Sequence, residues 1–158
     1  MAKEVVKVVN KGTQGNARIM ANDLKDLTPR SDKTGVHMAD GWTTRNLDAS
    51  PNLVTVEIYN ADPRFDAATG SAGKGPSIGQ ILEYGSRPHE IKARGGGTLN
   101  FYWPAVGKFI SVKSVQHPGT RPYGFMVIAT DSALGRAEKL INAAAIVLRQ
   151  TARKFSGA

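Results

Sequence analysis

The chain has 158 residues, a formal net charge of +8 and no cysteine. Its length predicts a single domain over residues 1–158 that needs no disulfide or metal to hold a core, and the lack of cysteine excludes thiol catalysis and cysteine-zinc sites. Because it has neither a signal-peptide pattern nor a run of about 18 apolar residues, we expect a protein made in soluble form without membrane contact.

Residues 4–27 predict an amphipathic helix, because apolar side chains recur there at helical spacing with charged residues between them. Thr28-Pro29 ends it, since the residue before a proline is pushed out of the α region. Gly12 and Gly15 each weaken the helix by about 1 kcal/mol relative to alanine. We therefore expect it to bend there or to begin near Thr13.

Two strands are expected next, after a polar turn region over residues 29–36. They cover residues 38–47 and 53–60, and the second alternates apolar and polar side chains as a half-buried strand does. Residues 50–52, Ser-Pro-Asn, predict the turn between them.

Residues 62–76 are rich in glycine, alanine and serine, lack periodicity and predict a flexible loop. A short helix follows, with Ser77 as its N-cap. Gly85 is expected to stop that helix by adopting a left-handed C-cap conformation.

Residues 91–115 predict a β region with two hairpin turns, one at Gly95–Gly97 and one at Pro104–Lys108. Alternation puts three large side chains on one face, which we expect to be core rather than a stacking platform for nucleic-acid bases: Leu99, Phe101 and Trp103.

Residues 123–154 predict a long helix with one apolar stripe, widened by Leu140 and Val147; Ala143–Ala145 allow another backbone to approach closely. The stripe consists of Leu134, Ala137, Ile141, Ala144, Leu148 and Thr151. Strands grouped between two terminal helices predict an α+β fold, with an antiparallel sheet packed against the N-terminal and the long C-terminal helix.

Motifs for catalysis or cofactor binding are missing from the sequence. The three histidines have no metal-ligand spacing, and residues 70–77 fail the phosphate-loop pattern because Gly75 follows Lys74. Glu83 has no second carboxylate beside it in the sequence, so we expect an ion pair with Arg87 or Arg121, or one across a subunit boundary. We therefore expect no enzyme, no metal and no cofactor.

The most basic part of the chain runs from Arg87 to Arg121 and contains one acidic residue, Glu90. Such a stretch suits contact with DNA phosphates or with an acidic protein. Its candidate contact residues are Arg87, Lys92, Arg94, Lys108 and Lys113.

Two short motifs lie about thirty residues apart. We expect them to act as joints between the elements of the subunit, either as chain turns or as positions in an interface. The first is Glu83-Tyr84-Gly85 and the second is His117-Pro118-Gly119, followed by Arg121. Pro118-Gly119 is a turn pair, so the default role of His117 is a local hydrogen bond.

These motifs carry a family likeness. Leu82-Glu83-Tyr84-Gly85-Ser86, then Leu99-Asn100-Phe101, then residues 115–120 and Pro122 with Phe125 and Ala129, resemble the tail-completion, or head–tail joining, family of long-tailed bacteriophages. The likeness is stronger over residues 81–131 than before them. Gly124 and Ile128 depart from the family, which commonly has prolines there.

The resemblance implies a fold like that of tail terminators and a structural role in the virion, with the protein made in the host cytoplasm. It implies a ring of copies of the chain, typically six, at the neck or the top of the tail. Head-closure or connector proteins, the tail terminator and tail-tube proteins would be its neighbours. Double-stranded DNA would pass through the ring without sequence-specific contacts.

Two other function classes stay open. A small basic module that binds nucleic acid through the β region and its aromatic side chains is the main alternative. A small hydrolase is the third, and the sequence offers no catalytic constellation for it.

Overall fold

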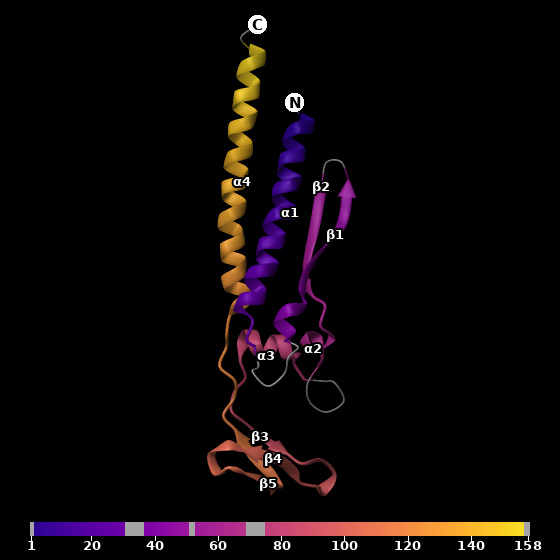
Figure 1. Cartoon of the computed structure of the whole chain (residues 1–158), viewed down its shortest axis with the longest axis vertical. Helices are drawn as coiled ribbons and strands as arrows, with labels where there is room; N and C mark the ends of the chain where they lie inside the picture. The colour runs from indigo at the N-terminus through magenta and orange to yellow at the C-terminus, as the bar shows by residue number, and fades with distance from the viewer. Residues whose placement is uncertain (1, 31–36, 51–52, 69–74, 157–158) are drawn as a thin grey trace.

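The computed structural model describes residues 2–30, 37–50, 53–68 and 75–156 and shows an elongated α+β molecule (Figure 1), which confirms the predicted fold class. In chain order the elements are α1 (Ala2–Leu27), η1 (Met38–Gly41), β1 (Trp42–Ser50), β2 (Leu53–Asn60), α2 (Pro63–Asp66), α3 (Ile78–Tyr84), β3 (His89–Lys92), η3 (Arg94–Gly96), β4 (Leu99–Trp103), η4 (Pro104–Val106), β5 (Lys108–Val112), β6 (Ser114–His117) and α4 (Phe125–Ser156).

The helices α1 and α4 lie antiparallel, and α4 extends beyond the N-terminal end of α1 (Figure 1). The expected late start of α1 near Thr13 is wrong, because the helix is continuous from Ala2. Gly12 has a packing role instead: a Cβ there would collide with the Leu140 side chain, so glycine lets the two helices approach. Asn16 joins them too, donating a hydrogen bond from Nδ2 to the Ala133 carbonyl oxygen at 2.9 Å.

The core of the described residues is small and centres on three aromatic rings. Trp42 meets Phe65 and Phe125 edge to face, with ring centroids 4.9 and 6.2 Å away. Leu24 of α1 and Ala129 of α4 complete this buried cluster. The core therefore joins the end of α1, the start of β1, α2 and the first turns of α4.

The antiparallel pair β1–β2 lies along the side of α1 that faces away from α4 (Figure 1), with Trp42 paired to Asn60 at its base. The two predicted strands are confirmed, except that residues 38–41 form η1 rather than strand. Of the predicted turns, residues 31–36 and 51–52 lie outside the described residues.

The prediction of a loop over residues 62–76 is wrong in part. Pro63–Asp66 form the short helix α2, which Asp62 caps by accepting a hydrogen bond from the Arg64 backbone; residues 69–74 lie outside the described residues. The predicted N-cap of α3 is confirmed, because Ser77 forms a capping box with Gln80. Gly85 ends α3 with φ 75° and ψ −175°, a positive φ as expected but not the left-handed helical conformation.

Residues 89–117 form a hairpin with two successive antiparallel ladders, here called the arm, that lies apart from the helices (Figure 1). In its base β3 pairs with β6, and beyond them β4 pairs with β5. The hairpin turn expected at Gly95–Gly97 is wrong, since β3 does not pair with β4, whereas the turn at Pro104–Lys108 is confirmed. The antiparallel strands described thus fall into three two-stranded ladders instead of one sheet.

The arm has no core of its own. No residue from His89 to His117 is buried, so the expectation that one face of β4 is core is wrong. Leu99 and Phe101 are half-buried, and Trp103 is 44% exposed. The physical reason is that the arm is a single layer of strands, and no other part of the chain that the structure describes forms a second layer over either of its faces.

Candidate functional site

The two motifs predicted to form joints lie side by side where the arm meets the body. Ser86 and Thr120 form an isolated antiparallel bridge, with backbone N···O distances of 2.9 and 3.1 Å. The Ser86 hydroxyl also accepts a hydrogen bond from the Thr120 backbone at 3.0 Å. Segments 34 residues apart in the sequence therefore form one joint, through which both ends of the arm reach the body.

Two glycines make this joint possible, because both have a positive φ and neither has room for a side chain. Gly119 has φ 87°, and a Cβ on it would collide with the Ser86 carbonyl oxygen. Gly85 has φ 75°, and a Cβ on it would lie 2.5 Å from the Thr120 carbonyl oxygen. A side chain at either position would strain the backbone and push the two segments apart.

Glu83 caps α4. Its carboxylate accepts hydrogen bonds from the backbone N–H of Met126 at 2.9 Å and of Val127 at 3.3 Å, and the residue is 4% exposed. The expected ion pair with Arg87 or Arg121 is wrong. A negative charge at a helix N-terminus satisfies unpaired N–H groups and complements the helix dipole.

Sequence reasoning missed this capping role. The available signal was the lack of a capping side chain at the start of the last helix, where Gly124 precedes Phe125.

The other residues of the two motifs surround the joint. Tyr84 is 75% exposed, and Pro118 and Arg121 are also exposed. His117 accepts a hydrogen bond at Nδ1 from the Gly119 backbone at 3.1 Å, the local bond expected of it. Its ring lies against that of His89, 5.1 Å between centroids, a pairing that only the β3–β6 register reveals. No group of three potential metal ligands occurs among the described residues.

A basic cavity of about 850 Å³ lies at the joint, between the base of the arm and Pro76 and Ile81 of the body. It brings together three of the predicted contact residues, Arg87, Lys92 and Arg94, with both histidines in its lining. The pKa of Glu90, also in the lining, is lowered by hydrogen bonds first from Lys92 and then from Ser114. Lys108 and Lys113 do not line the cavity, and Lys108 lies opposite Trp103 at the far end of the β4–β5 ladder.

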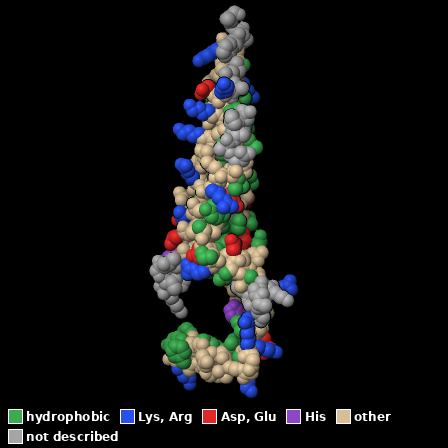
Figure 2. All heavy atoms as spheres, turned by 90° about the vertical axis from the view of Figure 1, so that its right-hand side faces the viewer, with side chains coloured by type: hydrophobic (Ala, Val, Ile, Leu, Met, Phe, Trp, Pro, Cys, Tyr) green, Lys and Arg blue, Asp and Glu red, His purple; other side chains and the backbone are tan. Residues whose placement is uncertain are grey.

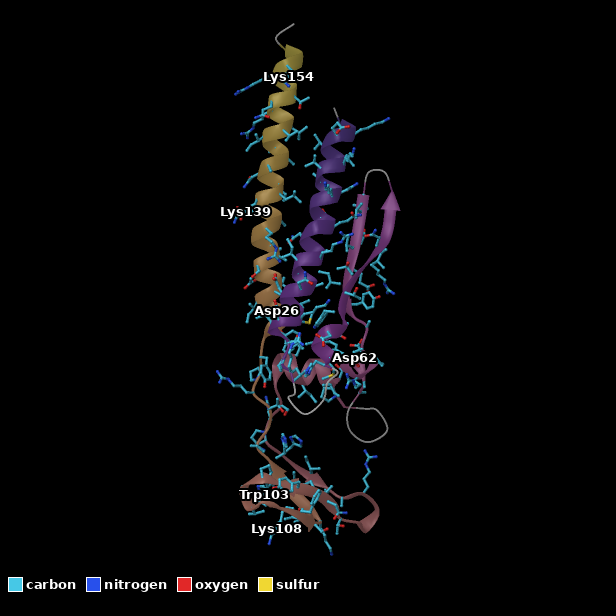
Figure 3. All side chains as sticks on the ribbon, in the orientation of Figure 1. Asp26, Asp62, Trp103, Lys108, Lys139 and Lys154 are labelled. Carbon is cyan, nitrogen blue, oxygen red and sulfur yellow. The ribbon has the colours of Figure 1, made fainter. Side chains whose placement is uncertain are left out.

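Both faces of the arm carry exposed apolar side chains. One face has a groove of about 520 Å³ lined by residues of β3, β4 and β6, including Ile91, Phe101, Trp103 and Val115. On the other face Tyr102 and Phe109 meet edge to face at 5.5 Å, and Phe109 is 77% exposed. Figure 2 shows hydrophobic side chains gathered on one part of the arm and Lys and Arg side chains on another. Trp103 and Lys108 lie at the end of the molecule opposite Lys154 (Figure 3).

The surface of the molecule is larger than that of a compact monomer. It measures 11359 Å², whereas a compact protein of 16.9 kDa exposes about 7700 Å². Much of the α4 stripe predicted from sequence contributes to it, because Leu134 and Ile141 are 62% and 68% exposed. The described surfaces therefore offer two kinds of binding site, a cavity lined by cations and exposed apolar faces.

Comparison of the chain with protein-family models, curated proteins and solved structures found no match. No described helix is long and apolar enough to cross a membrane.

Proposed function

We propose that this chain is a non-catalytic structural subunit of a bacteriophage neck or tail top, where copies of it form a ring that joins tail to head around the DNA channel. The observation that carries the proposal is the arm, a projecting hairpin with apolar faces and no core of its own. The motifs that resemble the tail-completion family are also the ones that build the joint of this arm, through Ser86 and Thr120.

An arm of this kind favours assembly over a monomeric role. Tyr102, Val106 and Phe109 are 51%, 50% and 77% exposed, and exposed apolar patches of this kind mark interaction sites. The arm and the body are different surfaces, so contact of one subunit's arm with the next subunit's body is heterologous. Heterologous contacts close into rings when the rotation between subunits is a fixed fraction of a turn.

The basic cavity supports a second part of the proposal, that the cavity at the joint faces the DNA. Arg87, Lys92 and Arg94 present three cations there against one carboxylate. Phosphate contacts of this sort give affinity without sequence readout, which suits DNA that slides through a channel. An acidic neighbouring ring would satisfy the same cations.

The proposal is tested by the assembly of the native chain into rings and by the loss of rings when apolar residues of the arm are replaced. We expect the full chain, alone or with head-closure and tail proteins, to give rings by native mass spectrometry and negative-stain imaging. Trp103→Ser with Phe109→Ser should abolish rings while leaving the helical circular dichroism unchanged, since neither residue is buried. The matched control is Ile19→Ser on α1, at a residue that is 46% exposed.

In a phage that carries the gene, its deletion should leave filled heads and separate tails. Infectious particles that form without it would overturn the neck role. A chain that stays monomeric with every virion protein, yet binds DNA tightly at physiological salt, would instead favour the nucleic-acid-binding module.

A further inference from the structure

An exposed apolar seam runs along α4. Four large apolar side chains follow one another at intervals of seven residues, namely Val127, Leu134, Ile141 and Leu148. They are 58%, 62%, 68% and 42% exposed. At 1.5 Å per residue the seam is about 32 Å long.

The seam points away from the packing that this chain provides. The α4 residues that meet the core or α1 are others, among them Phe125, Ala129 and Leu140. At 100° per residue, Ile141 lies about 100° around the helix from Leu140, so the two belong to different faces. The helix therefore has one face on α1 and a second apolar face with nothing from the described residues over it.

A strict seven-residue repeat points to another helix as the occupant. Straight helices drift away from such a repeat, so a pattern kept over three intervals is typical of helices that supercoil around each other. Ala144, three positions after Ile141, is only 7% exposed and belongs to the face that packs within the chain, so the large side chains alone make up the seam.

The charges of α4 select the direction of the second helix. The exposed charged residues of its first half are Asp131, Glu138 and Lys139, and those of its second half are the three cations Arg149, Arg153 and Lys154. In a parallel pair, each charged residue of α4 would lie beside the same residue of the second copy. An antiparallel copy instead brings Asp131 to the level of the three cations of the second half.

We infer that the seam binds the α4 helix of a second copy of this chain, antiparallel and centred near Ile141. In this arrangement Ile141 lies opposite Ile141 of the second copy, and Leu134 lies opposite Leu148. Asp131 then lies two residues, or about 3 Å along the axis, from the level of Arg149 in the second copy. Both carboxylate–guanidinium pairs form at once, because the two-fold axis repeats each contact.

This contact goes beyond the ring proposed above. A two-fold contact is isologous and pairs subunits, whereas the ring needs a heterologous one through the arm. The two surfaces lie on different elements, so a subunit can use both. Pairing along α4 is therefore expected whether or not the chain serves in a phage neck.

Cysteine cross-linking tests the seam cleanly, because the chain has no cysteine of its own. Under mild oxidation of the full chain, Ile141→Cys should become mostly disulfide-linked dimer, since a close two-fold contact brings the two Cα atoms within about 7 Å. Ile146→Cys is the matched control. It is 52% exposed on the same helix but about 140° around it from Ile141, and it should stay monomeric.

The direction is tested by mixing variants. Leu134→Cys and Leu148→Cys should each cross-link poorly alone and efficiently when mixed, whereas a parallel pair would cross-link each variant with itself. Asp131→Arg should weaken dimerisation about fivefold to tenfold, and Asp131→Arg with Arg149→Asp should restore it. Equal cross-linking of Ile141→Cys and Ile146→Cys, or efficient cross-linking of Leu134→Cys with itself, would overturn the inference. Neither result bears on rings formed through the arm.

Discussion

The Glu83 carboxylate accepts a hydrogen bond from the backbone N–H of Met126 at 2.9 Å, which ties the end of α3 to the start of α4 across 43 residues of sequence. The whole arm lies between these two residues. The cap therefore fixes the two ends of the inserted segment at one place on the body, and Ser86 and Thr120 continue the pairing outward.

Removing this cap should destabilise the protein. Glu83→Ala leaves N–H groups at the α4 terminus without a partner in a buried site, and we expect a loss of about 1–3 kcal/mol in the free energy of unfolding. Glu83→Gln keeps one acceptor oxygen and should lose less. Urea denaturation measures both, and Glu138→Gln on the exposed surface of α4 is the control, expected to be near neutral.

The joint glycines provide a second prediction. Gly119→Ala should destabilise more than Gly124→Ala, although both residues have positive φ, at 87° and 62°. A Cβ at Gly119 meets the Ser86 carbonyl oxygen, whereas one at Gly124 meets nothing within 4 Å. We expect about 1 kcal/mol for the backbone strain alone and more where the clash adds to it. Equal midpoints in thermal melts of the two variants would contradict this steric account.

Local chemistry explains which parts of this fold were predictable from sequence. Ser77 and Gln80 form the capping box because both lie within one helical turn, and Thr28-Pro29 ends α1 for a reason contained in two residues. Alternation likewise located β2. These features depend on neighbours in the chain, which a sequence displays directly.

Long-range pairings account for what could not be predicted. The register that sets β3 against β6, and so His89 against His117, depends on contacts 28 residues apart. Likewise, Gly12 has a low helix propensity, yet its missing side chain lets α1 pack closely against Leu140 of α4. No local sequence pattern reveals this contact. The α4 stripe was visible, yet its spacing alone did not distinguish a face covered by the same chain from one left for another.

The acidic cap of α2 should make stability depend on pH. The pKa of Asp62 is lowered from 3.8 to about 2, mainly by the hydrogen bond from the Arg64 side chain and also by that from its backbone. A lowered folded-state pKa means that the stabilisation is present above the unfolded value and is lost as pH falls toward about 2.

Comparison of the native chain with Asp62→Asn measures this effect. The difference in free energy of unfolding should shrink as pH falls from about 5 to about 2, because only the native chain loses the charged interaction. Arg64→Met removes the cause of the shift and should flatten the same pH dependence. A difference that grows on acidification would have the wrong sign for this explanation.

The basic cavity makes a prediction about salt. If it binds DNA phosphates, Arg87→Ala with Lys92→Ala and Arg94→Ala should weaken binding to duplexes of any sequence and reduce the slope of log affinity against log salt by about 3. Lys7→Ala with Lys11→Ala and Arg18→Ala, all exposed on α1, is the matched control. An unchanged slope in the cavity variant would assign those cations to a protein neighbour.

The attachment of the arm has a consequence for how such a chain can change over time. His89 and His117 are paired neighbours, so the 27 residues between them enter and leave the body at nearly one point. A segment inserted in this way can be lengthened, shortened or exchanged for another hairpin without moving the helices. The body can therefore stay constant while the arm diverges to suit a different neighbour.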